Sequence, residues 1–214
     1  ARLDQMFERA VELGMPAIAM TDHGNMHGAY DFYKQAKKAG IKPIIGMEGY
    51  LTPGTARNEK VRVRWNDGDE DDVSGGGAYT HMTMLAQTTE GMHNLFRISS
   101  LASLEGFYYK PRADRELLEK YAKGLIATTG CASGEVQTLL RIGDYEKARQ
   151  AAADYRDIFG PENFFIEFMD HGLDIERRSM EGLLRLMKDL NLQPIATNDS
   201  HYTHPADTEA HAHL

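Results

Sequence analysis

Six short apolar runs of the sequence each carry, at or beside one end, a residue type that can bind a metal ion. The runs and residues are TDH (Asp22, His23), GMEG (Glu48), THMTMLA (His81), TTGC (Cys131), MDH (Asp170, His171) and NDSH (Asp199, His201). Imidazole nitrogens, carboxylate oxygens and thiolates are the donors that proteins use for zinc and related cations. If the runs are parallel strands of one α/β domain, their ends meet at one rim of the sheet. The sequence therefore predicts a metal cluster at that rim.

Asp199 and His201 give the strongest single signal. They are two residues apart at a predicted strand end, so both side chains point the same way and could bind one ion or neighbouring ions. The alternative is a helix cap, in which Asp199 or Ser200 caps a helix that begins near Pro205. The sequence leaves both interpretations open.

Asp22 and His23 are adjacent at the end of another run, so they normally face opposite ways. We expect His23 to be the ligand. A ligating imidazole usually donates its second N–H to a carboxylate or carbonyl, and Asp22 is predicted to orient His23 in this way.

Glu48 and His81 each have an alternative role. Glu48 follows an apolar run, and a buried carboxylate requires a partner, which a metal or an arginine would supply. His81 stands at the start of its run rather than its end, which weakens the rim argument for it and favours a buried core histidine.

Cys131 is the only cysteine of the chain, so an internal disulfide is excluded. A lone cysteine is most often a small buried hydrophobe. Beside histidines and carboxylates, thiolate ligation indicates zinc, with manganese as the alternative because most donors are N and O. His171, together with Glu167 in the same run, is predicted to support the ligands from a second layer.

The elements that would position these residues repeat one design four times. An amphipathic helix is followed by a turn, usually glycine (Gly14, Gly40, Gly124), and then by a short apolar run. A glycine at that turn predicts a left-handed residue that ends the helix. The runs at 17–20, 44–47, 125–128, 164–168 and 195–197 predict strands covered on both faces. Alternating strands and helices predict an α/β fold with a parallel sheet: a distorted TIM-like barrel first, an open doubly wound sheet second.

Length and charge limit the remaining possibilities. The 214 residues fit one domain, and a net charge of -8 disfavours extensive electrostatic binding to duplex DNA.

Residues 54–77 lack the helical and strand periodicity of the rest of the chain, carry the acidic run 67–72 and end in three glycines. This composition predicts a surface insertion rather than a cation site. The lone cysteine and the lack of a long apolar span favour a reducing, cytoplasmic setting without a membrane.

Three longer stretches carry a family resemblance: MTDHGNMHGAYDFYKQAKKAGIKPIIGMEGYL, GFYYKPRADRELLEKYAKGLIATTGCASGE and PIATNDSHYTHPAD. They resemble the PHP (polymerase and histidinol phosphatase) domain, in the branch found at the N-terminus of the bacterial replicative DNA polymerase III alpha subunit. The resemblance implies a distorted (β/α)7 barrel with a trinuclear metal site of zinc, or of manganese or magnesium. The ligands that it implies are His23, Glu48, His81, Cys131, Asp199 and His201.

The ends of the chain favour a fragment, residues 1–214 being a single domain without its first strand. The family's opening His-x-His motif is expected upstream of residue 1, so the isolated chain is expected to be inactive.

The resemblance implies a metal-dependent 3′→5′ exonuclease that proofreads the primer end during DNA replication. Asp199, His201 and Glu48 would be central to the chemistry, and Lys110 and Arg112 could contact the DNA backbone. The implied partners are the primer 3′ end, the remainder of the polymerase chain, and replisome proteins such as the sliding clamp or a separate exonuclease subunit. Two alternatives stay open. One is a silent structural module that stabilises the polymerase and docks a separate exonuclease; the weaker one is a stand-alone small-molecule phosphatase.

Overall fold

The computed structural model describes residues 1–65 and 74–213. The acidic run 67–72 lies outside them. The strands are β1 (Ala17–Met20), β2 (Lys42–Leu51), β3 (Thr80–Ala86), β4 (Arg112–Ala113), β5 (Leu125–Thr128), β6 (Phe164–Phe168) and β7 (Gln193–Ala196). The helices are α1 (Leu3–Glu12), α2 (Ala29–Ala39), α3 (Thr89–Glu105), α4 (Arg115–Tyr121), α5 (Glu135–Arg141), α6 (Tyr145–Phe159), α7 (Asp174–Asp189) and α8 (Thr208–His211), with 3₁₀ turns η2 (Ser74–Gly77) and η3 (Pro205–Asp207).

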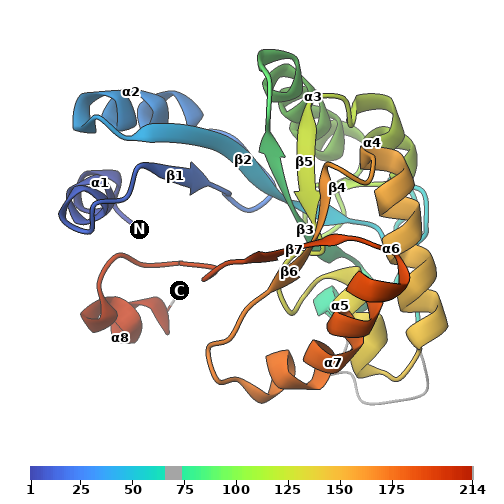
Figure 1. The fold of residues 1–214 in the computed structure, drawn as a ribbon. Coiled ribbons are helices and arrows are strands. Elements are labelled where there is room, and N and C mark those ends of the chain that lie inside the picture. Colours follow the sequence, from blue (N-terminus) through green and yellow to red (C-terminus); the bar gives the residue numbers. More distant parts are fainter. Residues whose placement is uncertain (66–73, 214) are drawn as a thin grey trace.

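The strands form one curled sheet in the order β1-β2-β3-β5-β6-β7, with β4 beside the end of β2. Helices alternate with the strands and cover the sheet, and β1 and β7 lie at its two ends (Figure 1). The predicted α/β class and its barrel-like curvature are confirmed. Among the strands described here, β1 and β7 are not paired with each other, so the sheet is a half-barrel.

The prediction of an entirely parallel sheet is wrong for β3. This strand is antiparallel to both of its neighbours, β2 and β5, whereas β1–β2, β5–β6 and β6–β7 are parallel. A parallel return requires a long crossover, usually through an α-helix. In the described part of the connection from β2 to β3 the only helical element is the short η2 turn. The chain therefore enters β3 from the same rim at which it left β2.

Local signals in the sequence define the helices. Thr88, Asp114 and Asp144 cap the starts of α3, α4 and α6 by accepting a backbone N–H with a side-chain oxygen. Each such cap contributes about 1 kcal/mol. Gly14, Gly40 and Gly124 have φ between 66° and 75°, which confirms the predicted left-handed turns.

The core lies between the sheet and the helices. Its fully buried large side chains include Leu95, Ile98, Leu118, Tyr155 and Phe164. Burial of such a side chain contributes roughly 1.5–3 kcal/mol. The apolar residues of α1, α6 and α7 recur at helical spacing and pack against this core. In the described part of the chain no helix is long and apolar enough to cross a membrane.

Arg112 is fully buried where β4 meets the end of β2. Its guanidinium donates to the carbonyl oxygens of Gly106 (3.0 Å), Ala78 (3.0 Å), Arg57 (3.1 Å) and Glu59 (2.8 Å). The side chain thus ties both ends of the β2–β3 connection to the end of α3. The suggestion that Arg112 contacts DNA is wrong, because the guanidinium is enclosed and bonded to protein carbonyls. Lys110 is exposed, and its contact with DNA stays a prediction.

We expect Arg112→Met to lower the free energy of unfolding by about 3 kcal/mol or more, because two buried and two partly buried carbonyl oxygens lose their donors. Urea denaturation measures this change. The control is Arg149→Met on the exposed face of α6, for which we expect less than about 0.5 kcal/mol. Equal effects of the two substitutions would contradict the structural role of Arg112.

Candidate metal centre

The centre lies at the rim where β1 and β2 end and β3 begins. The β1–β2 ladder continues past β1 through a parallel bridge between His23 and Glu48. Because β3 is antiparallel, His81 at its start lies opposite Tyr50 and close to Glu48. The backbone N–H of His81 donates to Ser133 O (3.0 Å), which brings the loop after β5 to the same place. The reversed strand direction explains how a residue at the start of its run reaches the rim.

Three side chains form the tight part of the centre. His81 Nδ1 lies 2.5 Å from Glu48 Oε1, and His23 Nε2 lies 3.4 Å from Glu48 Oε2. Ligand atoms of the three residues all lie within 4.8 Å of one another. Cys131 Sγ is 3.6 Å from Glu48 Oε1 and 3.7 Å from His81 Nδ1. Two imidazoles, a carboxylate and a sulfur therefore converge on a space that fits the donor chemistry of a zinc-like ion.

Glu48 carries the buried charge of the centre, with only 5% of its surface exposed. Burial raises the pKa of this carboxyl, but the hydrogen bond and charge of His81, together with His23, lower it to below its ordinary value. The pKa of the Cys131 thiol is raised by burial and by the charge of Glu48. A cation close to the sulfur has the opposite effect and favours the thiolate.

Asp199 and His201 lie across a cavity of about 260 Å³ that also borders His23 and Glu48. The rings of His23 and His201 are 5.7 Å apart. Asp199 has φ 43°, and its backbone oxygen lies 2.7 Å from His201 Nδ1. Burial and the charge of Glu48 raise the pKa of Asp199. The two residues thus face the tight cluster without belonging to it.

The helix-cap alternative for Asp199 and Ser200 is wrong. The turn at Pro205 is capped by His204, whose backbone N–H donates to Asp207 Oδ2 (3.1 Å) in a reciprocal capping box. The side chain of Asp199 is therefore not needed to begin that helix.

The two predicted supporting residues differ in geometry. His171 Nδ1 lies 2.5 Å from Glu176 Oε1, and His171 Nε2 lies 2.8 Å from the backbone oxygen of Asn198. The Glu176 hydrogen bond and the Asn198 carbonyl raise the pKa of His171. Among the described hydrogen bonds none joins the Asp22 carboxylate to the His23 ring. Support by His171 and by Asp22 stays a prediction.

A second buried carboxylate, Glu167 on β6, lines the same small cavity as Cys131, and the sequence predicts only a supporting role for it. It accepts hydrogen bonds from Thr128 and from Thr197 (2.5 Å), so it links β5, β6 and β7. Burial is the main reason that its pKa is raised. The two threonines were missed, although each follows an alanine in the similar segments IATTGC and IATNDSH.

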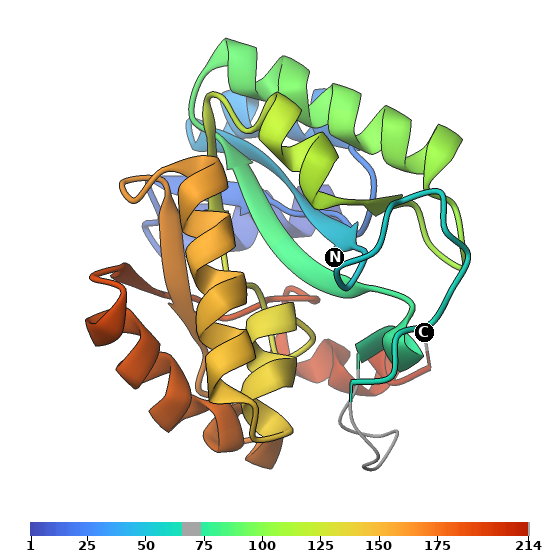
Figure 2. The same ribbon diagram turned by 90° about the vertical axis from the view of Figure 1, so that its right-hand side faces the viewer.

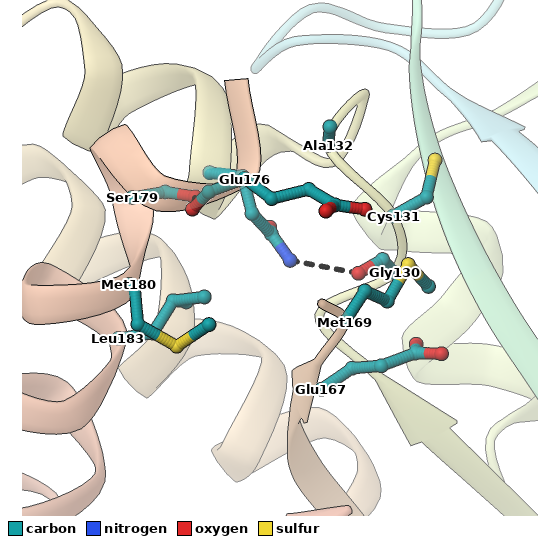
Figure 3. Close-up of a pocket in the computed structure, with 10 residues that line it drawn as sticks. Gly130, Cys131, Ala132, Glu167, Met169, Glu176, Ser179, Met180 and Leu183 are labelled. Atoms are coloured by element: carbon teal, nitrogen blue, oxygen red, sulfur yellow. Dashed lines mark hydrogen bonds between the residues drawn. The ribbon is translucent and has the colours of Figure 1, made fainter. Parts of the chain in front are cut away.

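A cavity of about 20 Å³ adjoins this carboxylate. Figure 3 shows it beside the turn of Gly130 and Ala132, with Met169 and Met180 around it and Glu167 at its edge. The dashed line is the hydrogen bond from Gln137 Nε2 to Gly130 O (2.7 Å). This packing holds the loop that carries Cys131.

We expect Gly24→Ala to destabilise the protein more than Gly14→Ala. Both glycines have left-handed φ values, 68° and 66°. A Cβ at Gly24 would lie 2.8 Å from the Tyr50 ring and 2.9 Å from Pro111, whereas a Cβ at Gly14 meets nothing within 4 Å. The shared backbone strain cancels, and the close contact adds about 1–3 kcal/mol. Thermal and urea unfolding measure the difference, and equal losses would contradict the close packing at the rim.

Comparison with known proteins identifies the family. A family model described as PHP domain matches residues 1–171. The DNA polymerase III subunit alpha of Saccharopolyspora erythraea is 58% identical over 223 residues, covering 100% of this chain and 19% of the relative. That of Mycobacterium tuberculosis is 54% identical over 205 residues, covering 94% and 17%. The chain thus spans about a fifth of the length of these relatives.

Two solved structures share the fold at 14% identity. A candidate metal-dependent phosphoesterase from Bifidobacterium adolescentis has a TM-score of 0.51 and is matched over 95% of this chain and 84% of its own. An amidohydrolase from Chromobacterium violaceum has a TM-score of 0.52, with 96% and 83% covered. The family match and the high identity to the polymerase subunits lead to one conclusion: the chain belongs to the PHP domain family.

Proposed function

We propose that this PHP domain is a metal-dependent phosphodiesterase within a bacterial replicative DNA polymerase, acting as a 3′→5′ exonuclease on the primer end. The observation that carries the proposal is the convergence of His23, Glu48 and His81, with ligand atoms within 4.8 Å, at a rim shared with Cys131. The names of the relatives, DNA polymerase III subunit alpha, supply the biological setting.

The residues present fit a metal ion. Glu48 is a buried carboxylate whose nearest partners are two imidazoles and a thiol, a mixture that suits zinc best, with manganese or magnesium as the alternative. His23, Glu48, His81 and Cys131 would hold the tight part of a trinuclear site, and Asp199 and His201 would hold the far side. When bound, such ions polarise a phosphodiester, lower the pKa of water and stabilise a leaving oxygen.

The side chains themselves supply orientation and charge. Glu48 keeps a negative charge at the floor of the site because its pKa is depressed by His81 and His23. His201 is oriented by its contact with the backbone oxygen of Asp199. These groups leave the cavity between them open to a phosphodiester.

The charge of the chain favours local recognition of DNA. A net charge of -8 disfavours binding to duplex DNA through many electrostatic contacts with its phosphates. A single strand end needs only a few contacts, and Lys110 is an exposed cation near the rim. We propose the primer 3′ end and the remainder of the polymerase chain as the partners, in the cytoplasm.

We expect Asp199→Asn to lower release of a mismatched 3′ nucleotide at least about 100-fold in the full-length protein, because a carboxylate of the metal site is lost. A labelled primer with zinc or manganese measures the rate, and His93→Gln on the exposed face of α3 should keep it. A metal-loaded protein that is no faster than the Asn variant would contradict the nuclease function. That outcome would leave a structural or docking module.

Metal binding is a separate prediction. We expect Glu48→Gln to weaken zinc or manganese binding at least tenfold, whereas Glu162→Gln at an exposed position leaves it unchanged. Isothermal titration calorimetry measures the affinity. Metal at 100 times its Kd should also raise the free energy of unfolding by about 2.7 kcal/mol, and the thermal midpoint should rise with it. Identical affinities of the two variants would show that Glu48 is not a ligand.

A further inference from the structure

The loop of residues 106–112, between α3 and β4, is held rigidly next to the centre. At its base the Arg112 guanidinium and backbone N–H both donate to Gly106 O, at 3.0 and 3.3 Å. Gly106 has no room for a side chain, since a Cβ would lie 1.9 Å from Arg112 O. The N–H of Tyr108 donates to Lys110 O (3.1 Å), which closes the tip. These contacts restrict the backbone conformation of the loop at its base and at its tip.

This rigid loop holds two aromatic rings in solvent. Phe107 and Tyr109 are each 58% exposed. Tyr109 has φ 62°, a backbone conformation that is unusual for a bulky residue. Tyr108 anchors it from beneath, with its ring 4.5 Å from the Tyr109 ring and 5.0 Å from the Arg112 guanidinium. Large rings that are both exposed and fixed in place indicate a binding surface.

Two cations lie at the loop, one beside the exposed Tyr109 ring and the other beside the buried Tyr50 ring. The Arg62 guanidinium lies 4.8 Å from the centre of the Tyr109 ring, and Lys110 Nζ lies 5.6 Å from the centre of the Tyr50 ring. Arg62 comes from the segment after β2, and that segment lies beside the loop (Figure 2). Exposed rings beside cations match the chemistry of single-stranded nucleic acid, in which bases stack on rings and phosphates meet cations.

The end of the loop at Lys110 and Pro111 lies beside residues that contact the metal centre. The Tyr50 ring, beneath Lys110, lies 5.1 Å from the His81 ring and 6.1 Å from the His23 ring. Pro111 packs against Gly24, next to His23. A strand bound on the loop would thus have its end close to Glu48.

We propose that Phe107 and Tyr109, with Arg62 and Lys110, bind the unpaired 3′-terminal nucleotides of single-stranded DNA and deliver the terminal phosphodiester to the metal centre. This inference rests on the proposed function. The rings can stack only on bases that have left the duplex, so the surface selects a frayed, mismatched end over a paired one. We favour single-stranded DNA over a protein partner because the Arg62 guanidinium lies 4.8 Å from the centre of the exposed Tyr109 ring and Lys110 follows that ring in the chain.

The test is photo-crosslinking in the full-length protein. A primer with iododeoxyuridine at its 3′ end and phosphorothioate linkages against cleavage is irradiated with the protein, and the crosslinked peptides are identified by mass spectrometry. We expect crosslinks within residues 106–112. Phe107→Ala and Tyr109→Ala should reduce them and raise KM for a mismatched primer about tenfold each, with kcat little changed.

Control substitutions distinguish the loss of an aromatic ring from a loss of folding. Phe107→Tyr and Tyr109→Phe keep a ring and should keep the crosslink, and Leu104→Ala, at an 82% exposed position of α3, should change nothing. Activity with no crosslink to the loop and unchanged KM would overturn the inference while the nuclease function stands. Variants that lose stability but keep the crosslink would also overturn it, since the loop would then pack against protein. A crosslink without nuclease activity would instead uphold binding and refute the proposed function.

Discussion

The buried carboxylate of Glu48, held between the His81 and His23 imidazoles, is the interaction on which the rest of the centre depends. A charge enclosed to 95% requires close partners, because an isolated carboxylate loses its hydration on burial. Those partners come from the end of β1 and the start of β3, on either side of β2. The position of one side chain therefore constrains the register of three strands.

The antiparallel direction of β3 brings His81 to Glu48 and so completes the site. A parallel β3 would begin at the opposite rim and carry His81 away from Glu48. The antiparallel strand begins beside the carboxylate and also pairs with β5, whose following loop carries Cys131. Arg112 stabilises this arrangement by binding carbonyl oxygens at both ends of the β2–β3 connection. The same guanidinium fixes the base of the loop with Phe107 and Tyr109, so one buried cation supports both the fold and the proposed DNA surface.

Local features of the sequence could be predicted, and features that depend on distant contacts could not. The glycine turns and apolar helix stripes follow from backbone freedom and helical spacing, so they were confirmed. The proximity of His23 and Glu48 follows from the ends of parallel strands meeting at a rim, whereas His81 joins them only because β3 is antiparallel. Strand direction was missed for β3 because it is decided by the connection, whose residues lack periodicity. Arg112 was misread because its carbonyl partners lie 6 to 55 residues away, and a guanidinium in a polar segment resembles a surface residue.

The central claim is that Glu48, His23 and His81 form a metal site. Its most direct test is X-ray diffraction from crystals of the protein grown with zinc or manganese, with data on both sides of the absorption edge of the metal. We predict an anomalous difference peak at bonding distance from Glu48, His23 and His81, about 2.0–2.2 Å for zinc. A crystal with full metal in the buffer, ordered side chains and no peak at this position would contradict the account.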